Sequence, residues 1–408
     1  MSIPKITDAQ LEEQREIMLR VRDVNVSRFG SDYYAFVDVY GCQQNEADGE
    51  ILRGMLQQMG YGFTENEADA DFILINTCAV REHAEQRVLG NIGHLVHTRK
   101  PGQKIAVCGC AVQQPGMRDK LLKSYRHVDL IFGPHELWRF PELLERTLES
   151  NARIAETRDI DGERVEGLPS LRKSGDKAWL SIMYGCNNFC SYCIVPYVRG
   201  RERSRELDYV IAEAKTLISE GFSEITLLGQ NVNSYGGDLT GGSPMFPRLL
   251  RELNALDGDF TLHFRTSHPK DAGEELFTAI AECSKVSRKL IHLPFQSGNN
   301  RVLAAMNRKY TSEEYIAKID RLRELAPGVT FSGDVIVGFP GETDEEFEDT
   351  LSLVERVRFG KLFTFIYSPR SGSPAAEMPD PFTRAEKLTR FNRLIDLQKQ
   401  IETDFTSV

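Results

Sequence analysis

The chain has 408 residues, and its 60 acidic and 50 basic side chains give a formal net charge of −10. Hydrophobic residues make up 41% and charged residues 27%, which is ordinary for a globular protein and excludes disordered, collagen-like and low-complexity classes. No apolar run reaches the ~18–20 residues that cross a membrane, and no apolar signal core follows Met1, so we expect a cytoplasmic protein without a membrane partner. The acidic balance means that any RNA contact must rest on a local basic patch.

From about residue 32 the sequence alternates short apolar segments with helix-like segments. The apolar segments predict four strands, at 34–40, 71–76, 104–107 and 128–132. Parallel strands need a helical crossover between them, so this alternation predicts a wound parallel α/β sheet. We expect this domain to span residues 33–150, after an N-terminal extension over residues 1–32.

A second alternating series follows the charged segment 151–174, which lacks a clear apolar period and is predicted to be a linker. The series holds six strand candidates, at 178–183, 224–228, 260–264, 290–293, 330–337 and 362–367. Six βα units are fewer than the eight of a closed barrel, so we expect a partial (β/α)6 barrel over residues 175–408, although a wound open sheet would also fit. In either case the working face lies at the carboxyl ends of the strands.

Three cysteines follow the first strand of the second series at the spacing C-x3-C-x2-C. These loop cysteines are Cys186, Cys190 and Cys193. Clustered thiols in a cytoplasmic chain indicate metal or redox chemistry, and thiolates suit iron–sulfur clusters or zinc. Zinc normally takes a fourth protein ligand, and none follows at the usual spacing. Three ligands would instead leave one iron of a four-iron, four-sulfur cluster open to an external ligand.

Three further cysteines each stand just beyond a predicted strand of the first domain. These edge cysteines are Cys42, Cys78 and Cys110. Neighbouring parallel strands end at one edge of a sheet, so thiols far apart in sequence can meet there. One such cysteine is most often a small buried hydrophobe, but three at equivalent positions indicate a shared ligand. Cys108 competes with Cys110 for the third place, and we favour Cys110 because it follows Gly109, where the chain turns out of the strand.

The cysteine loop resembles the signature of the radical S-adenosylmethionine (SAM) enzymes. Over nearly the whole chain the sequence resembles the methylthiotransferase family within that superfamily. Segments 81–87 and 194–201 are most similar to the branch of the family that acts on isopentenyl-modified adenosine in tRNA. The other stretches that carry the resemblance are YGCQQN (40–45), NTCAVRE (76–82), LGQNV (228–232), HLPFQSG (292–298) and VGFPGET (337–343).

The resemblance implies an enzyme with two four-iron, four-sulfur clusters. The edge cysteines would ligate an auxiliary cluster, and the loop cysteines would ligate the cluster that binds SAM. The implied reaction converts N6-isopentenyladenosine at position 37 of tRNA to its 2-methylthio derivative. One SAM supplies the methyl group, and a second supplies a 5′-deoxyadenosyl radical that abstracts the hydrogen from the unactivated carbon 2 of the adenine. The sulfur comes from the auxiliary cluster. The implied partners are the tRNA anticodon loop and an external electron donor, and we expect a monomer.

Further contacts with SAM and RNA are predicted from the same resemblance and from position. Tyr192, the aromatic residue before the last loop cysteine, would lie against the SAM adenine. Residues at the carboxyl ends of strands are predicted SAM contacts, with plain loop structure as the alternative: Gln230, Asn231, Ser267, Gln296, Ser297, Val337 and Gly338. Arginines just after the cysteine loop are predicted to contact tRNA phosphates, with surface salt bridges as the alternative: Arg199, Arg201 and Arg203. Arg308, Lys309 and Arg265 are weaker candidates for the same contact.

Other functions remain open at this point. The same chemistry could act on threonylcarbamoyl-modified adenosine or on a ribosomal protein aspartate. A two-cluster electron carrier would usually complete four ligands on each cluster, and a zinc-binding RNA adaptor would contain no labile sulfide. The family normally ends in a small β-barrel RNA-binding module, the TRAM domain. No strand-period sequence follows the last predicted helix before Val408, so either the chain is truncated or this member lacks the module, and we expect weaker tRNA affinity.

Overall fold

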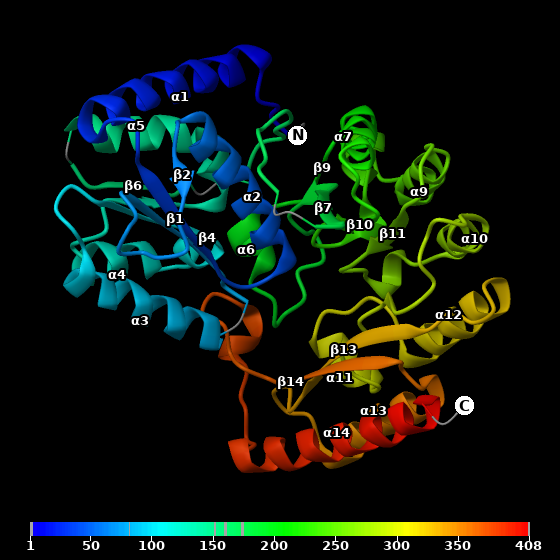
Figure 1. Ribbon diagram of the computed structural model, residues 1–408. Helices are drawn as coiled ribbons and strands as arrows, with labels where there is room; N and C mark the ends of the chain where they lie inside the picture. Colours follow the sequence, from blue (N-terminus) through cyan, green and yellow to red (C-terminus); the bar gives the residue numbers. More distant parts are fainter. Residues whose placement is uncertain (1–2, 81, 151, 159–160, 173–174, 407–408) are drawn as a thin grey trace. The chain divides into compact units, whose positions relative to one another are not determined.

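The computed structural model describes residues 3–80, 82–150, 152–158, 161–172 and 175–406 (Figure 1). The chain forms two compact units, one made of residues 1–175 with 194–205 and the other of residues 176–193 with 206–408. Residues 194–205, which we assigned to the second domain, therefore pack with the first. Arg81, which belongs to two of the segments of family resemblance (76–82 and 81–87), lies outside the described residues. No helix in the described ranges is both long and apolar enough to span a membrane.

The first unit is built on a six-stranded, all-parallel sheet with strand order β2-β1-β3-β4-β5-β6. Its strands are β1 (Tyr34–Val39), β2 (Gly62–Phe63), β3 (Phe72–Thr77), β4 (Lys104–Gly109), β5 (Leu130–Phe132) and β6 (Ile154–Glu156). The central strands β3 and β4 are buried along their whole length, as apolar runs between two helical layers should be. The wound parallel sheet is confirmed. Strand β6 shows that the segment predicted as a linker begins inside this sheet.

Helices cover both faces of this sheet (Figure 1). One face is covered by α1 (Asp8–Phe29), α2 (Gln43–Gln58) and α5 (Phe140–Ser150), and the other by α3 (Glu82–Thr98) and α4 (Met117–Ser124). The N-terminal extension is thus mostly α1, which begins with a capping box between Thr7 and Gln10. The remaining elements of the unit are the 3-10 turns η1 (Cys110–Gln113) and η2 (Pro134–Arg139), with α6 (Val195–Arg199) and β9 (Arg203–Ser204).

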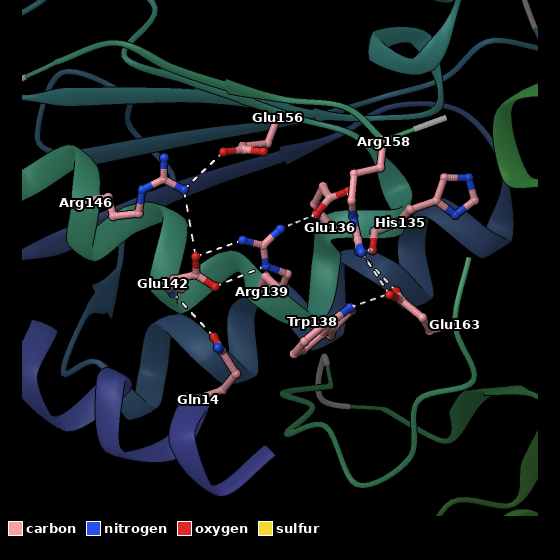
Figure 2. Close-up of polar contacts among 10 residues, drawn as sticks. All are labelled: Gln14, His135, Glu136, Trp138, Arg139, Glu142, Arg146, Glu156, Arg158 and Glu163. Atoms are coloured by element: carbon pink, nitrogen blue, oxygen red, sulfur yellow. Dashed lines mark hydrogen bonds and ion pairs between the residues drawn. The ribbon is translucent and has the colours of Figure 1, made fainter. Parts of the chain in front are cut away.

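A buried ion-pair network fixes η2 at the carboxyl end of β5 (Figure 2). Glu136 is fully buried and pairs with Arg139 at 2.9 Å and with Arg158. Arg158 also pairs with Glu163 at 2.8 Å and donates to the backbone oxygen of His135 at 3.1 Å. A buried carboxylate is stable only when it is paired and hydrogen-bonded, and two arginines meet that need. The network therefore fastens the stretch after β6 to the edge of the sheet where the edge cysteines lie.

The second unit contains six parallel-paired strands in two three-stranded sheets, with orders β11-β10-β7 and β12-β13-β14. A parallel bridge between Leu262 and Val286 extends the first sheet beyond β11. The six strands match the six predicted segments, and the partial (β/α)6 barrel is confirmed. They are β7 (Lys177–Ser181), β10 (Glu224–Leu228), β11 (Thr261–Phe264), β12 (Ile291–His292), β13 (Phe331–Val337) and β14 (Lys361–Ile366).

Helices of the second unit enclose one apolar core with these strands. The longer ones are α7 (Leu207–Ser219), α9 (Phe246–Asn254), α10 (Glu274–Glu282), α12 (Ser312–Leu325), α13 (Asp344–Val357) and α14 (Arg384–Thr406). Capping boxes at Thr311 and Thr343 set the starts of α12 and α13, so both crossovers begin at defined residues. Shorter elements are β8 (Met183–Tyr184), η3 (Val232–Ser234), α8 (Gly237–Thr240), η4 (Pro269–Asp271), α11 (Asn300–Ala305) and η5 (Pro374–Glu377).

Candidate functional site

The edge cysteines lie at the carboxyl ends of three neighbouring strands, β1, β3 and β4. The Cys78 thiol hydrogen-bonds to Cys42. The sulfurs of Cys42 and Cys110 each lie 3.8 Å from Oδ1 of Asn45. Cys108, in contrast, is buried inside β4. The structure thus brings together the three thiols that the sequence singled out, although 68 positions separate the first from the last.

Two residues of the segment after β1 make this convergence possible. Gly41 has φ +113°, and a Cβ atom there would lie 2.3 Å from Cβ and 2.5 Å from Sγ of Cys78. Only glycine permits that approach. Asn45 is buried, and its Nδ2 donates to the backbone oxygens of Tyr40 and Thr77, both at 2.8 Å. Asn45 therefore ties the ends of β1 and β3 together beside the thiols.

A buried arginine also contacts this site. Arg199 is 5% exposed, and its Nε donates to Sγ of Cys110 at 3.0 Å. Its Nη2 donates to Oδ1 of Asn45 at 2.8 Å and to Oδ2 of Asp48 at 2.6 Å. Asp48 is 4% exposed, so both charges of the pair are buried. This placement contradicts the prediction that Arg199 contacts tRNA phosphates, because the guanidinium faces the thiols and not the surface.

The charges around the edge cysteines favour one thiolate. The hydrogen bond with Cys78, together with the Arg199 guanidinium, lowers the pKa of the Cys42 thiol to about 6. The same hydrogen bond and burial raise the pKa of Cys78, and burial raises the pKa of Cys110 to about 11. Metal binding would displace the remaining thiol protons, because the thiolate is the ligand form.

The donor set fits an iron–sulfur cluster better than a single metal ion. In the described part of the chain, no three His, Cys, Asp or Glu side chains converge as ligands of one ion. The protein ligands of a four-iron cluster bind different iron atoms, so they surround a core and need not converge on one point. Three soft thiols around one buried edge, with an arginine donating to one sulfur, meet that requirement.

The other two arginines predicted to bind RNA differ from each other. Arg203 is buried, and its Nη1 donates to the backbone oxygens of Arg199 at 2.9 Å and Arg201 at 3.0 Å. This arginine therefore holds the chain after α6 in place, which contradicts a phosphate contact. Arg201 is exposed, and its contact with RNA stays a prediction.

The loop cysteines lie after β8 in the second unit. Cys186 and Cys190 are buried, and Cys193 is half-buried. The loop is held by the turn after α11, where the backbone oxygen of Met306 accepts from the Ser191 amide at 3.0 Å. Asn307 in that turn donates to the backbone oxygen of Phe189 at 2.8 Å. These bonds give the loop a defined path around the three thiols.

Arg308 is buried beside the loop cysteines, which contradicts its predicted RNA contact. It is 7% exposed, and its Nη1 donates to Sγ of Cys190 at 3.5 Å. Nη2 donates to the backbone oxygen of Pro294 at 2.8 Å, and the guanidinium lies over the Tyr310 ring, 5.1 Å from its centroid. Each thiol set therefore has its own buried arginine hydrogen-bonded to one sulfur.

The strand ends of the second unit present several buried polar groups. Gln230 accepts a hydrogen bond from the amide of Gly185, next to the first loop cysteine. Asn231 donates to Asp271 at 2.7 Å, but its Oδ1 has no hydrogen-bond partner among the described residues, and neither do Oγ of Ser267 and Nε2 of His268. Buried polar atoms without partners mark a place for a polar ligand, so this edge fits the polar part of SAM.

The remaining predicted SAM contacts are placed as follows. Tyr192 is half-buried and packs against an apolar cluster that includes Phe339. The Ser297 hydroxyl lies 3.4 Å from the Thr350 hydroxyl and accepts from an amide, so it is engaged in loop structure. Gln296 continues the pairing with β13.

The fifth strand ends in a close contact with α14. Val337, the last residue of β13, is fully buried. Gly338 has φ +68°, and a Cβ atom there would lie 2.5 Å from Cγ of Lys387, so this glycine makes room for a lysine of α14. Contacts of either residue with SAM stay predictions.

Glu342, four residues beyond Gly338, should make stability depend on pH. It is 1% exposed, and burial raises its pKa to about 7. Oε2 accepts from the Gly338 amide at 2.7 Å, while Oε1 has no partner among the described residues, so little compensates for burial of the ionised form. A raised pKa contributes stability that is complete below pH 4.5 and is lost as the pH rises through about 7.

The expected result is a pH-dependent difference between the wild type and Glu342→Gln. Between pH 5.5 and 8.5 the wild type should lose about 2 kcal/mol relative to the variant, which cannot ionise at this position. Urea unfolding of both proteins at the two pH values measures the difference. Parallel pH profiles would mean that Glu342 is ionised throughout, held by Arg390 at 3.6 Å.

Comparison with known proteins adds independent findings. Residues 180–354 match the Radical SAM superfamily, and residues 34–133 match the uncharacterized protein family UPF0004. A tRNA-2-methylthio-N(6)-dimethylallyladenosine synthase of Acetivibrio thermocellus is 46% identical over 404 residues, which cover 98% of this chain and 84% of that protein. The protein of the same name from Alkaliphilus oremlandii is 48% identical over 402 residues, with the same coverage of each chain.

Among solved structures, this chain is similar to a radical S-adenosylmethionine methyltransferase, TsrM, from Kitasatospora setae. The TM-score is 0.60 at 14% identity, over 84% of this chain and 75% of that chain. At that identity the likeness shows the fold alone, and it agrees with the arrangement of strands described above.

Proposed function

The chain belongs to the family of the tRNA-2-methylthio-N(6)-dimethylallyladenosine synthases, and on that premise we propose that it adds a methylthio group to carbon 2 of N6-isopentenyladenosine at position 37 of tRNA. The observation that carries the proposal is the meeting of the edge cysteines around Asn45 and Arg199. Cleavage of SAM needs only one thiol set, the loop cysteines. Insertion of sulfur would need a second cluster, and the second thiol set, at the ends of three separate strands, could hold it.

The geometry supports an assignment of the residues that would hold each cofactor. When bound, two four-iron, four-sulfur clusters and SAM would supply the sulfur, the methyl group and the hydrogen-abstracting radical. The edge cysteines would hold the auxiliary cluster and the loop cysteines the other one. Arg199 and Arg308 each donate to one ligand sulfur, so they are positioning residues that orient a ligand and place a cation beside it.

The second unit would hold SAM at the carboxyl ends of β10 and β11. The unpartnered atoms of Asn231 and Ser267 would receive its polar groups, and Tyr192 would pack against its adenine. An external electron donor is needed for reductive cleavage, and it is part of the proposal. The substrate base would enter from a single-stranded loop of tRNA, where a base can be turned out for chemistry.

The proposal is tested with anaerobically reconstituted protein and three substrates in parallel: tRNA with isopentenyladenosine, tRNA with threonylcarbamoyladenosine, and unmodified tRNA. We expect the 2-methylthio nucleoside, detected by mass spectrometry of tRNA hydrolysates, with the first substrate alone. Product on the threonylcarbamoyl substrate would replace the proposed substrate while keeping the chemistry. If none of the three tRNAs is methylthiolated while SAM is still cleaved, the proposed substrate is rejected. The remaining candidate substrate is then a protein, such as a ribosomal protein aspartate.

The two alternatives outside methylthio transfer have their own signatures. A two-cluster electron carrier would contain iron and sulfide but would not cleave SAM when reduced. A zinc-binding adaptor would contain zinc without labile sulfide. Metal and sulfide analysis of the same preparation separates both from the enzyme.

A further inference from the structure

One stretch of the first unit is strongly basic although the whole chain is acidic. Between Gln86 and Arg126 there are eight Lys or Arg side chains and a single acidic residue, Asp119, which gives a formal charge of +7 in a chain of −10. The eight cations are Arg87, Arg99, Lys100, Lys104, Arg118, Lys120, Lys123 and Arg126. Solubility alone does not require positive charges to cluster in one stretch of the chain. The cluster therefore indicates a surface for a negatively charged partner.

Part of this charge is used within the fold. Arg99 and Lys104 pair with Asp129 at 2.9 Å and 3.6 Å, which fastens the chain around β4. Lys100 pairs with Asp71 at 3.0 Å. These three cations therefore have structural partners and are set aside.

The other five cations are exposed and form what we call the basic face: Arg87, Arg118, Lys120, Lys123 and Arg126. Arg118 lies 3.8 Å from the exposed Asp119, a pairing of little energy. In the ranges that the structure describes, Lys120, Lys123 and Arg126 form no ion pair. Their charge is available to a partner.

The basic face starts beside the edge cysteines. Arg87 lies on α3, which follows Cys78, and the other four cations lie on the stretch from α4 to Arg126, which follows η1 and Cys110. Both helices cover the same face of the sheet (Figure 1). The eight residues of α4 extend about 12 Å from the edge where the thiols lie. A ligand lying along α4 would therefore reach the thiol site at one end.

The opposite face of the same sheet provides a contrast. The arginines of α1 alternate with acids, and Arg15 and Arg20 pair with Glu12 and Glu145 at 2.7 Å. Compared with α1, the α3–α4 side therefore carries an excess of exposed cations.

We propose that the basic face binds the phosphate backbone of the tRNA whose loop base is presented to the edge cysteines. This inference rests on the proposed function for the identity of the polyanion. Several exposed lysine and arginine side chains suit the phosphates of a nucleic-acid backbone, which repel one another unless cations neutralise them. The face thereby positions the RNA without reading its sequence.

The test compares two triple variants that remove the same charge. The face variant is Lys120→Gln/Lys123→Gln/Arg126→Gln. The control is Lys215→Gln/Lys289→Gln/Lys399→Gln, which changes three exposed lysines of the second unit. All six positions are exposed, so both variants should keep the far-UV circular dichroism and melting temperature of the wild type. Filter binding of isopentenylated and unmodified tRNA is measured over a series of salt concentrations.

We expect the face variant to bind both tRNAs at least about tenfold more weakly at low salt, with the slope of log K against log salt reduced by roughly 2–3. The control should stay within about twofold of the wild type. Equal affinity and slope in the face variant and the wild type would overturn the proposal, and so would an equal loss in the control. The methylthio assay of the wild type tests the proposed function separately. The binding experiment does not depend on that assay, because tRNA binding is measured without turnover.

Discussion

Changing any one of the edge cysteines to alanine is expected to abolish methylthio transfer and to leave SAM cleavage intact. Loss of a ligand should lower product formation by more than about 100-fold, since loss of a residue that only hydrogen-bonds to a metal ligand already costs about 10–100-fold. Iron and sulfide should fall to about half, because one of two four-iron clusters is lost. The nucleoside product and 5′-deoxyadenosine are measured in the same anaerobic reaction.

Cys108 supplies the matched control for this experiment. It is two residues from Cys110 and buried in β4, so Cys108→Ala removes the same atom from a buried position just before the ligand. We expect that variant to keep its full iron content and both reactions. Loss of the cluster in Cys108→Ala together with retention in Cys110→Ala would reassign the third ligand. Retained methylthio transfer in all three edge variants would contradict the sulfur-insertion proposal itself.

The convergence of the edge cysteines could be predicted because it follows from topology. Each thiol stands within three positions of the end of an apolar segment, and parallel strands joined by helices must end at one edge. The observed order β1-β3-β4 places the three strands next to one another. The alternation of strands and helices in the sequence does not determine that order. The short strands β2 and β6 were not predicted, because two or three residues carry no measurable period.

The polar partners of the thiols could not be predicted in the same way. Arg199 contacts Cys110 across 89 positions of sequence, and its alternation with Arg201 and Arg203 is typical of an exposed, charged strand or loop. Only the packing of residues 194–205 against the first unit buries it. The sequence indicates the roles of Asn45 and Asp48 only weakly. Both are polar residues at positions of α2 where an amphipathic helix would normally bury apolar side chains.

Loss of Arg199 alone is expected to destabilise the first unit severely. Arg199→Met would leave Asp48 buried without its partner, and breaking a buried ion pair costs about 3–5 kcal/mol. Whole domains are stable by only about 5–15 kcal/mol, so this single change would remove a large share. Asp48→Asn should also destabilise the unit, because it leaves the guanidinium buried without a carboxylate.

The double variant Arg199→Met/Asp48→Asn should recover most of the loss, because it removes both buried charges at similar volume. The chain has two tryptophans, so a Trp179→Phe background leaves Trp138 as a fluorescent reporter of the first unit. Urea unfolding of the metal-free protein gives the four free energies of the cycle. Additive losses in the double variant would mean that the two charges are not coupled. A stable double variant that nevertheless fails to retain iron would show that the arginine acts on the cluster ligands through its bond to Cys110, since the cost of the unpaired charge would then be absent.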